Sequence, residues 1–287
     1  MTQASRTSRA AVWFVLGSIA SVQVGAAFAK GLFGRVPPTS MAWLRLVTAS
    51  AVLLLVSAIV RSRPTGRPAV RRNWGLVLAW SACLVTMNWA IYESFSRIPL
   101  GVAVTIEFLG PLTVAVLGSR RRVDLVWVAL AGCGVALLGL APTSPTLAGV
   151  GFALLAGAGW AGYIVLGSHV GRTWPSLDAL TIGCTLGAVA LAPWAISQGG
   201  DELWRPGIVA TGLAIGLLSS VIPYGLELTA LKSIPTAVFG ILMSLEPAAA
   251  ALAALVVLGE RLTPIDLLAM ACVVIASVGA TRTRASA

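Results

Sequence analysis

Charged side chains are scarce in this 287-residue sequence, and acidic ones are the scarcest. Aspartate and glutamate together number 10, lysine and arginine number 20, and charged residues make up 10 % of the chain. A soluble fold of this size needs far more charge to cover its surface, whereas 57 % of these residues are hydrophobic. The composition therefore excludes an ordinary soluble protein and predicts an all-α integral membrane protein.

Groups that usually hold metals or cofactors are also rare. The four cysteines stand in separate apolar runs without metal-ligand spacing, and His169 is the only histidine. The sequence has no GxxxxGK[ST] phosphate loop, and its one GxGxxG match, at 157–162, lies inside an apolar run where small residues favour close helix packing. HExxH and GxSxG motifs and paired intramembrane aspartates are missing too. We therefore expect no cofactor, no metal and no enzymatic activity.

Long apolar runs fill the chain instead. A helix must cross ~30 Å of hydrocarbon at ~1.5 Å per residue. Ten runs meet this length, near 10–30, 39–60, 74–96, 99–118, 123–141, 148–168, 177–197, 206–228, 236–258 and 264–281. The first is long enough to span and is interpreted as a retained helix rather than a cleaved signal. The longest loop, 61–73, leaves no room for a soluble domain.

Positive charge is concentrated between the apolar runs. The net charge is +10, with arginines clustered at 61–72 and 120–122, a pattern typical of cytoplasmic loops rather than of a nucleic-acid surface. With the N-terminus inside, 14 lysines and arginines fall in inside segments and 5 in outside segments. Both termini are therefore predicted to be cytoplasmic, with membrane lipid and a small molecule as partners and no nucleic acid.

One proline landmark occurs twice, 136 residues apart. Ile98-Pro99 is followed twelve residues later by Pro111, and Ile234-Pro235 is followed twelve residues later by Pro247. A Leu-Gly turn follows each copy; the first turn carries three arginines and the second carries one. By the charge count the first turn lies inside and the second outside, which indicates a repeat that runs in opposite directions through the membrane.

The repeat defines the predicted architecture. Ten helices divide into two halves of five, and an odd number per half requires the second half to be inverted. We predict one membrane domain with a first five-helix repeat at 1–142 and a second, inverted repeat at 143–287. In such architectures the substrate site lies near the bilayer midplane, where the repeats meet.

These segments also carry a family resemblance. Residues 98–111 (IPLGVAVTIEFLGP), 244–247 (SLEP), 258–262 (LGERL) and 20–30 (ASVQVGAAFAK) resemble the threonine/homoserine exporter branch of the EamA type, within the drug/metabolite transporter superfamily. The resemblance covers essentially the whole chain. It implies alternating-access export of small amino acids or related metabolites across the inner (plasma) membrane, driven by an ion gradient, as in proton antiport, or by the substrate gradient. It also implies that spans one to four and six to nine surround a central cavity, with spans five and ten peripheral.

Two glutamates are the leading candidates for the site. Glu107 is about eight residues into the fourth span and Glu246 about ten into the ninth, or ~12 and ~15 Å deep, so both lie near the midplane. A charge there costs roughly 2.5–3.5 kcal/mol. Such a carboxyl group could exchange a proton during transport or hold a substrate ammonium. The alternative is a neutral glutamic acid that ties helices together. The repeat offset matches Glu107 to Met243, one helical turn from Glu246, so a shared cavity is left open.

Arg45 is the one arginine within a predicted span. It could balance a carboxylate, either that of Glu93 or that of a substrate, or it could extend to the outer surface. The four-residue spacing of Glu93 and Arg97 favours an ordinary helix ion pair. Glu227 could pair with Lys232 or line the inner vestibule.

Polar and aromatic residues at depth complete the predicted substrate site. Aromatic rings with polar edges suit a cavity for a small amphipathic solute, although core packing is an equal alternative for each ring. Gln23 is expected by default to make a cross-helix hydrogen bond, and the family resemblance makes it a cavity candidate. Together with Arg45 and the two glutamates, the predicted substrate-binding residues are Gln23, Asn88, Trp89, Tyr92, Trp160 and Tyr163.

Other transport functions stay open from sequence alone. Two buried acids against one embedded arginine are compatible with export of cationic drugs or other metabolites. A passive uniporter would have the same architecture, and so would either a monomer or a homodimer. Whether a pH gradient drives concentrative flux distinguishes an antiporter from a uniporter.

Overall fold

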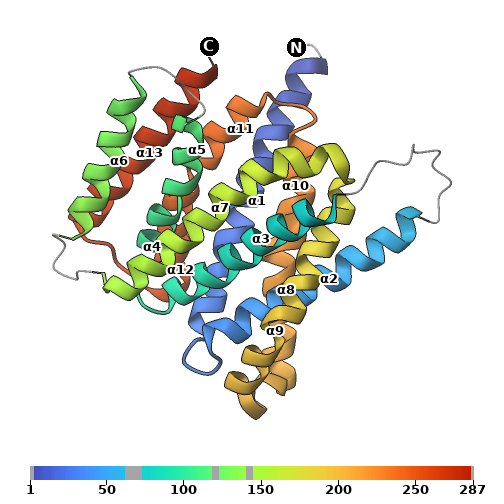
Figure 1. Ribbon diagram of the computed structural model, residues 1–287. Helices are drawn as coiled ribbons and strands as arrows, with labels where there is room; N and C mark the ends of the chain where they lie inside the picture. The colour runs from blue at the N-terminus through green and yellow to red at the C-terminus, as the bar shows by residue number, and fades with distance from the viewer. Residues whose placement is uncertain (1–2, 62–72, 118–122, 140–144, 286–287) are drawn as a thin grey trace.

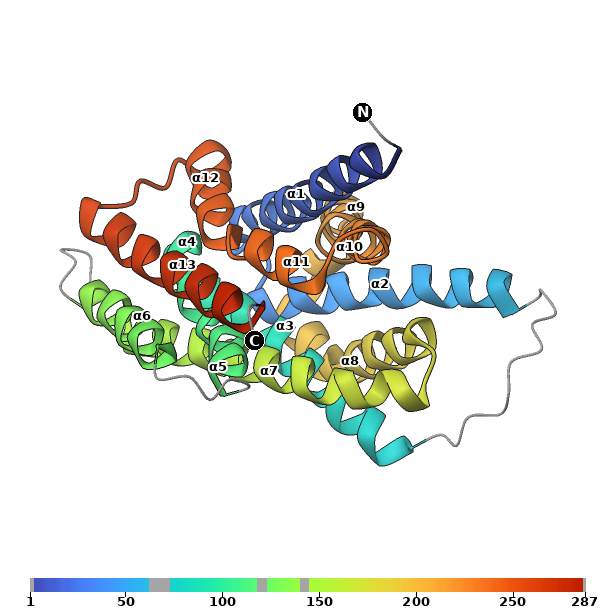
Figure 2. The ribbon, with the colours of Figure 1, turned by 90° about the horizontal axis from the view of Figure 1, so that it is seen from above.

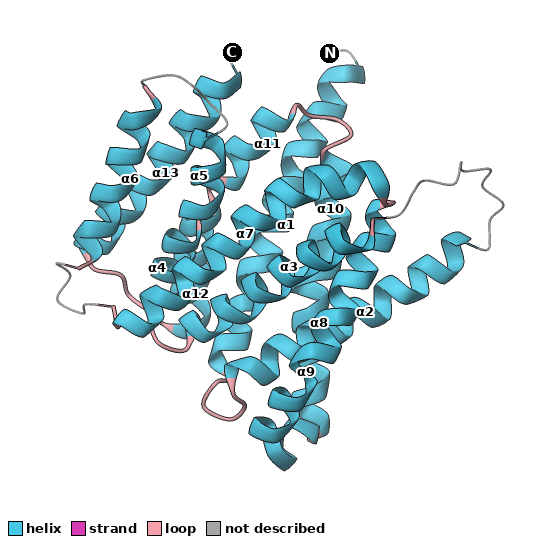
Figure 3. Cartoon of the chain, viewed as in Figure 1, coloured by secondary structure: helices cyan, strands magenta, loops and turns pink. Residues whose placement is uncertain are grey.

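The computed structural model describes residues 3–61, 73–117, 123–139 and 145–285, and within these ranges every regular element is a helix (Figures 1 and 3). In chain order they are α1 (Gln3–Gly31), α2 (Pro38–Arg61), α3 (Trp74–Phe95), α4 (Leu100–Glu107), α5 (Leu109–Leu117), α6 (Asp124–Leu138), α7 (Leu147–Thr173), α8 (Ser176–Gly199), η1 (Gly200–Trp204), α9 (Pro206–Gly216), η2 (Leu217–Val221), α10 (Ile222–Ala230), α11 (Thr236–Met243), α12 (Glu246–Leu258) and α13 (Pro264–Ala285). The arginine cluster at 120–122 and nearly all of the 61–73 loop lie outside the described residues.

Helix length identifies a multi-pass membrane protein. Within the described ranges, nine helical stretches are long and apolar enough to cross a bilayer. The predicted span at 123–141 corresponds to α6, whose described apolar stretch, Leu125–Leu138, is shorter than the others. The count of ten spanning helices therefore stays a prediction.

Three predicted spans are interrupted helices. Phe108 separates α4 from α5, and Ser244 and Leu245 separate α11 from α12. Both breaks lie just before a landmark proline, Pro111 or Pro247, whose missing N–H releases a backbone carbonyl from the helical ladder. The third interruption, η2, is one π-helical stretch between α9 and α10 and was not predicted. Such irregular backbone at membrane depth is tolerated where neighbouring protein groups satisfy it or where it faces a cavity.

Helices from the two halves of the chain pack against each other. The closest partners are α3 with α7, α2 with α8, α6 with α13, and α1 with α10 and α12. In Figures 1 and 2, α6 and α13 lie together at one edge of the bundle, and Figure 1 shows α4–α5 and α11–α12 running in opposite directions. Inversion of the complete halves stays a prediction.

Glycines make the tightest of these contacts possible. A Cβ atom on Gly110 of α5 would collide with the backbone of Gly157 in α7, and one on Gly159 would lie 2.9 Å from the Met87 nitrogen of α3. The structure thus confirms that the small residues at 157–162 serve helix packing. The close approach holds α7 against α3 and α5, beside the backbone of Glu107.

Candidate functional site

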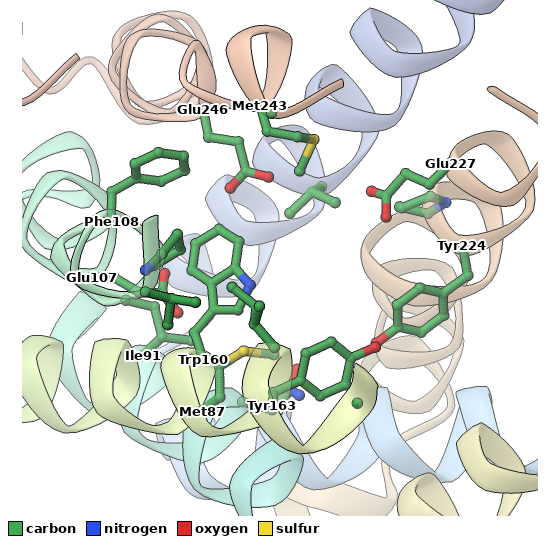
Figure 4. A pocket seen from close by; sticks show the side chains of 18 of the residues that line it. Met87, Ile91, Glu107, Phe108, Trp160, Tyr163, Tyr224, Glu227, Met243 and Glu246 are labelled. Carbon is green, nitrogen blue, oxygen red and sulfur yellow. The ribbon is translucent and has the colours of Figure 1, made fainter. Parts of the chain in front are cut away.

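One cavity of about 940 Å³ lies among the helices, and both buried glutamates line it (Figure 4). Glu107 is 8 % exposed at the end of α4, and Glu246 is 7 % exposed at the start of α12. Each glutamate therefore stands where a spanning helix is interrupted. The one-turn mismatch in the repeat offset does not separate them, because both are within the lining of the same cavity.

Seven of the nine predicted substrate-binding residues line this cavity. They are Gln23, Arg45, Asn88, Glu107, Trp160, Tyr163 and Glu246. The other two lie elsewhere. Trp89 donates a hydrogen bond from Nε1 to Thr39 Oγ1 at 3.1 Å, and Tyr92 is fully buried with its ring against Phe33 and Phe95. These two positions on α3 therefore belong to the packing behind the cavity wall.

The carboxyl groups differ in their partners. Gln23 of α1 donates from Nε2 to Glu246 Oε2 at 3.5 Å, the outer limit of a hydrogen bond. Among the described residues, no hydrogen bond or ion pair reaches the Glu107 carboxyl. Pro111 also releases the Glu107 backbone oxygen, and this oxygen would lie 2.7 Å from a Cβ on Gly157. The backbone at Glu107 is therefore held by packing, while its carboxyl faces the cavity.

Arg45 is held by the π-helical stretch rather than by an acid. Its Nη2 donates to the Ser219 backbone oxygen at 2.8 Å and its Nε donates to Ser220 Oγ at 3.0 Å. Both acceptors are uncharged groups of the π-helical stretch. Of the alternatives left open for Arg45, a pairing with Glu93 is not observed; Glu93 pairs instead with Arg97 at 2.7 Å, as their helical spacing favoured.

Aromatic side chains form one wall of the cavity. The Trp160 ring meets Phe108 edge to face at a centroid distance of 5.3 Å, and Tyr163 stacks on Trp80 at 4.8 Å. In Figure 4 the hydroxyl groups of Tyr163 and Tyr224 point toward each other. This wall offers flat apolar surface with hydroxyl groups at its edge, a suitable lining for small amphipathic solutes.

Other members of the lining were left open by the sequence or were not considered. Glu227, for which two alternatives stood, lines the cavity from α10 and accepts a hydrogen bond from Ser18 Oγ at 2.5 Å. Tyr224 and Ser219 line the cavity as well and were not considered. Pro223 was the available signal, because a proline inside a predicted span marks irregular backbone near a cavity.

Figure 1 shows both chain termini at one end of the bundle, and residues near this end are among those that line the cavity. Its lining includes Gly171 near the end of α7, Ser176 at the start of α8, Leu231 just after α10 and Thr281 near the end of α13. No described lining residue comes from the turns at the opposite end. Helix α13, expected to be peripheral, thus contributes to the cavity, while the described part of α6 does not.

Ion pairs and backbone contacts close the opposite end. Lys30 Nζ lies 2.6 Å from Glu260 Oε1 and donates to the Ile98 oxygen at 2.7 Å. Glu260 Oε2 accepts from the Leu100 backbone N–H at 3.0 Å. We call these four residues the latch; they join the end of α1, the start of α4 and the turn after α12. The sequence suggested both charged residues only as parts of motifs, not as a pair.

Comparison with known proteins agrees with this geometry. The model of the EamA-like transporter family matches twice, at residues 9–144 and 147–282. The threonine/homoserine exporter RhtA of Escherichia coli K12 is 39 % identical over 272 residues, covering 94 % of this chain and 90 % of the relative. RhtA of Salmonella typhimurium SL1344 is 38 % identical over 284 residues, covering 96 % and 94 %.

More distant matches extend the comparison. The uncharacterized transporter YwfM of Bacillus subtilis is 27 % identical over 248 residues, covering 82 % of this chain and 81 % of the relative. A solved crystal structure with 18 % sequence identity superposes with a TM-score of 0.66, covering 96 % of this chain and 98 % of that one, which shows a shared fold. With two family matches that together span nearly all of its length, this chain belongs to the EamA-like transporter family.

Proposed function

We propose that this protein is a secondary active transporter that exports small amino acids, such as threonine and homoserine, across the inner membrane. The observation that carries the proposal is the cavity that both Glu107 and Glu246 line, whose described lining reaches the end of the bundle that holds both termini. The high identity to exporters of threonine and homoserine supports the substrate class. In this proposal the seven lining residues of the predicted site contact the substrate.

Alternating access explains the one-sided cavity. With both termini in the cytoplasm, the conformation described here is open to the inside and held shut at the outside by the latch. Rocking of two inverted halves, 1–142 and 143–287, would break the latch and close the inner vestibule. The interrupted helices α4–α5 and α11–α12 lie where such a motion needs backbone that can bend.

The buried carboxyl groups are assigned to coupling. Glu107 has no described partner for its carboxyl, and burial at this depth disfavours the charged form. A proton taken up from the outside and released inside would let Glu107 and Glu246 alternate between neutral and charged states. Export of the amino acid would then be exchanged for proton entry.

A cationic substrate is the second candidate. Three acids, Glu107, Glu227 and Glu246, line the cavity against Arg45 as the one basic residue of its described lining. If the acids are ionised, a cationic drug or metabolite would balance this excess of negative charge. Comparing efflux of threonine with that of a quaternary ammonium compound from the same vesicles separates the two candidates.

Efflux from proteoliposomes tests the proposal. Vesicles containing the purified protein are loaded with labelled threonine or homoserine, and initial efflux is followed with and without a pH gradient. We expect Glu107→Gln and Glu246→Gln to lose efflux, or to lose its dependence on the gradient, while still reaching the membrane. Glu202→Gln, which removes a surface carboxylate outside the cavity, is the matched control. Full proton-coupled efflux from both cavity variants would overturn the site assignment.

A further inference from the structure

A buried amide oxygen in the cavity has no hydrogen-bond donor. Gln23 is 2 % exposed and lines the cavity from α1, and its Oε1 atom has no partner among the described residues. Leaving a buried acceptor unsatisfied destabilises the protein by about 1–3 kcal/mol. Because the amide nitrogen of the same side chain reaches Glu246, a donor-rich group placed here would meet an amide oxygen and a carboxylate together.

A second unpartnered group lies beside α1, on the neighbouring stretch η2. Ser219 in η2 is 2 % exposed, lines the cavity, and has no hydrogen-bond partner for its hydroxyl. Gly25 of α1 permits its close approach, since a Cβ at Gly25 would collide with the Ser219 hydroxyl. The neighbouring Ser21 fixes the same seam by donating to the Leu218 oxygen at 2.6 Å. One turn of α1 therefore adjoins both unsatisfied groups.

The Ser219 backbone oxygen also binds Arg45, the one basic residue of the described cavity lining. Arg45 binds the Ser219 oxygen and the Ser220 hydroxyl, both uncharged, and within the described chain no carboxylate forms an ion pair with it. Two of its guanidinium nitrogens are occupied, and Nη1 makes no hydrogen bond to any described residue. The charge of Arg45 is thus held in place by neutral groups and is available to an anion.

From these contacts we propose a zwitterion site in which Glu246 and the Gln23 oxygen bind the substrate's α-ammonium group, while Arg45 and the Ser219 hydroxyl bind its α-carboxylate. An α-amino acid carries these two charged groups on one carbon, so its two ends would contact the two pairs of groups within the same cavity lining. Its side chain would extend into the larger space bordered by Trp160 and Tyr163. The site therefore selects free α-amino acids by their shared ends, and it admits a range of side chains.

This inference rests on the proposed export function, and a competition experiment separates the two. The full-length protein in proteoliposomes takes up labelled threonine in exchange for internal threonine, and unlabelled analogues compete. The probes are threonine, its methyl ester, which lacks the carboxylate, and 2,3-dihydroxybutyrate, which lacks the ammonium. We expect each analogue to compete at least tenfold more weakly than threonine, because each loses charge-assisted hydrogen bonds.

Variants locate the two ends of the site. Gln23→Leu should reduce discrimination against the hydroxy acid and leave discrimination against the ester, whereas Ser219→Ala should do the reverse. Ser197→Ala, the same substitution on an exposed hydroxyl outside the cavity, should change neither ratio. If a cavity variant does not fold, the analogue ratios of the unmodified protein still test whether the site recognises both charged ends of the substrate.

The outcomes are distinct. An unmodified protein that does not exchange threonine at all contradicts the proposed function. A protein that exchanges threonine but accepts the ester or the hydroxy acid equally well retains that function and contradicts the zwitterion site. Threonine exchange in which both variants shift the same ratio, or neither ratio, likewise overturns the assignment of ends.

Discussion

The contact between α5 and α7 gives a sharp test of the fold around Glu107. A Cβ on Gly110 would collide with the Gly157 oxygen and lie 2.7 Å from its carbonyl carbon and 3.0 Å from its Cα. These are backbone atoms of a long helix and cannot rotate away, so Gly110→Ala requires the helices to separate. Overpacking of this kind destabilises by about 1–3 kcal/mol.

Gly151 on α7 is the matched control. A Cβ there would meet nothing within 4 Å, and Gly→Ala at an open helical site stabilises by about 0.4–1 kcal/mol. The two alanine variants should therefore differ by on the order of 1.5–4 kcal/mol. At ~2–4 °C per kcal/mol for a chain of this size, their melting midpoints should separate by roughly 3–16 °C.

The assay is thermal unfolding of the purified protein in one detergent, followed by intrinsic tryptophan fluorescence. Gly110→Ala should melt below the unmodified protein and Gly151→Ala at or slightly above it. Threonine efflux should also fall in Gly110→Ala, because separating α5 from α7 moves the backbone at Glu107. Equal midpoints for the two variants would refute the close backbone contact, and with it this account of how Glu107 is positioned.

Three further outcomes can be checked with the same preparations. Reversing one latch charge, Lys30→Glu or Glu260→Lys, should lower initial threonine efflux severalfold, and the double reversal should recover only part of it, because the exchanged side chains no longer suit the Ile98 oxygen and the Leu100 N–H; a double reversal no better than either single change would argue against a direct pair. Arg97→Met removes the charged partner of the buried Glu93 and leaves its carboxylate with Thr39 Oγ1 as a donor, so its melting midpoint should fall by roughly 2–12 °C; an unchanged midpoint would show that the pair does not stabilise the protein. Trp160→Ala removes the ring that borders the larger space, so phenylalanine should compete better against labelled threonine; unchanged competition would place the side-chain pocket elsewhere.

The sequence could predict some features of the site because a charged group at membrane depth carries an unfavourable free energy. A charged group inside an apolar run is energetically unfavourable, so two glutamates beside a repeated proline landmark were candidates for a site, although the sequence left open whether they face one cavity. Glu107 and Glu246 do line one cavity. The pairing of Glu93 with Arg97 was equally predictable, because helical spacing alone brings them together.

The sequence could not predict which residues of a helix face the cavity and which face its neighbours. Trp89 and Tyr92 have the right depth for the cavity but lie behind its wall, and no pattern on α3 distinguished them from Asn88. The pairing of Lys30 with Glu260 joins residues far apart in the chain, so spacing carried no information about it. The π-helical stretch inserts an irregular turn whose effect on Ser219 and Arg45 requires the packed structure.

Because the cavity is large, the transport cycle is coupled to the release and uptake of water. At about 30 Å³ per molecule, a space of about 940 Å³ has room for tens of water molecules, far more than a small amino acid displaces. Any conformation that closes tightly round one such substrate must first release most of that water. Solutes too large to enter the cavity draw water out and so favour closure, and the rate of export should therefore respond to water activity as well as to substrate and proton gradients.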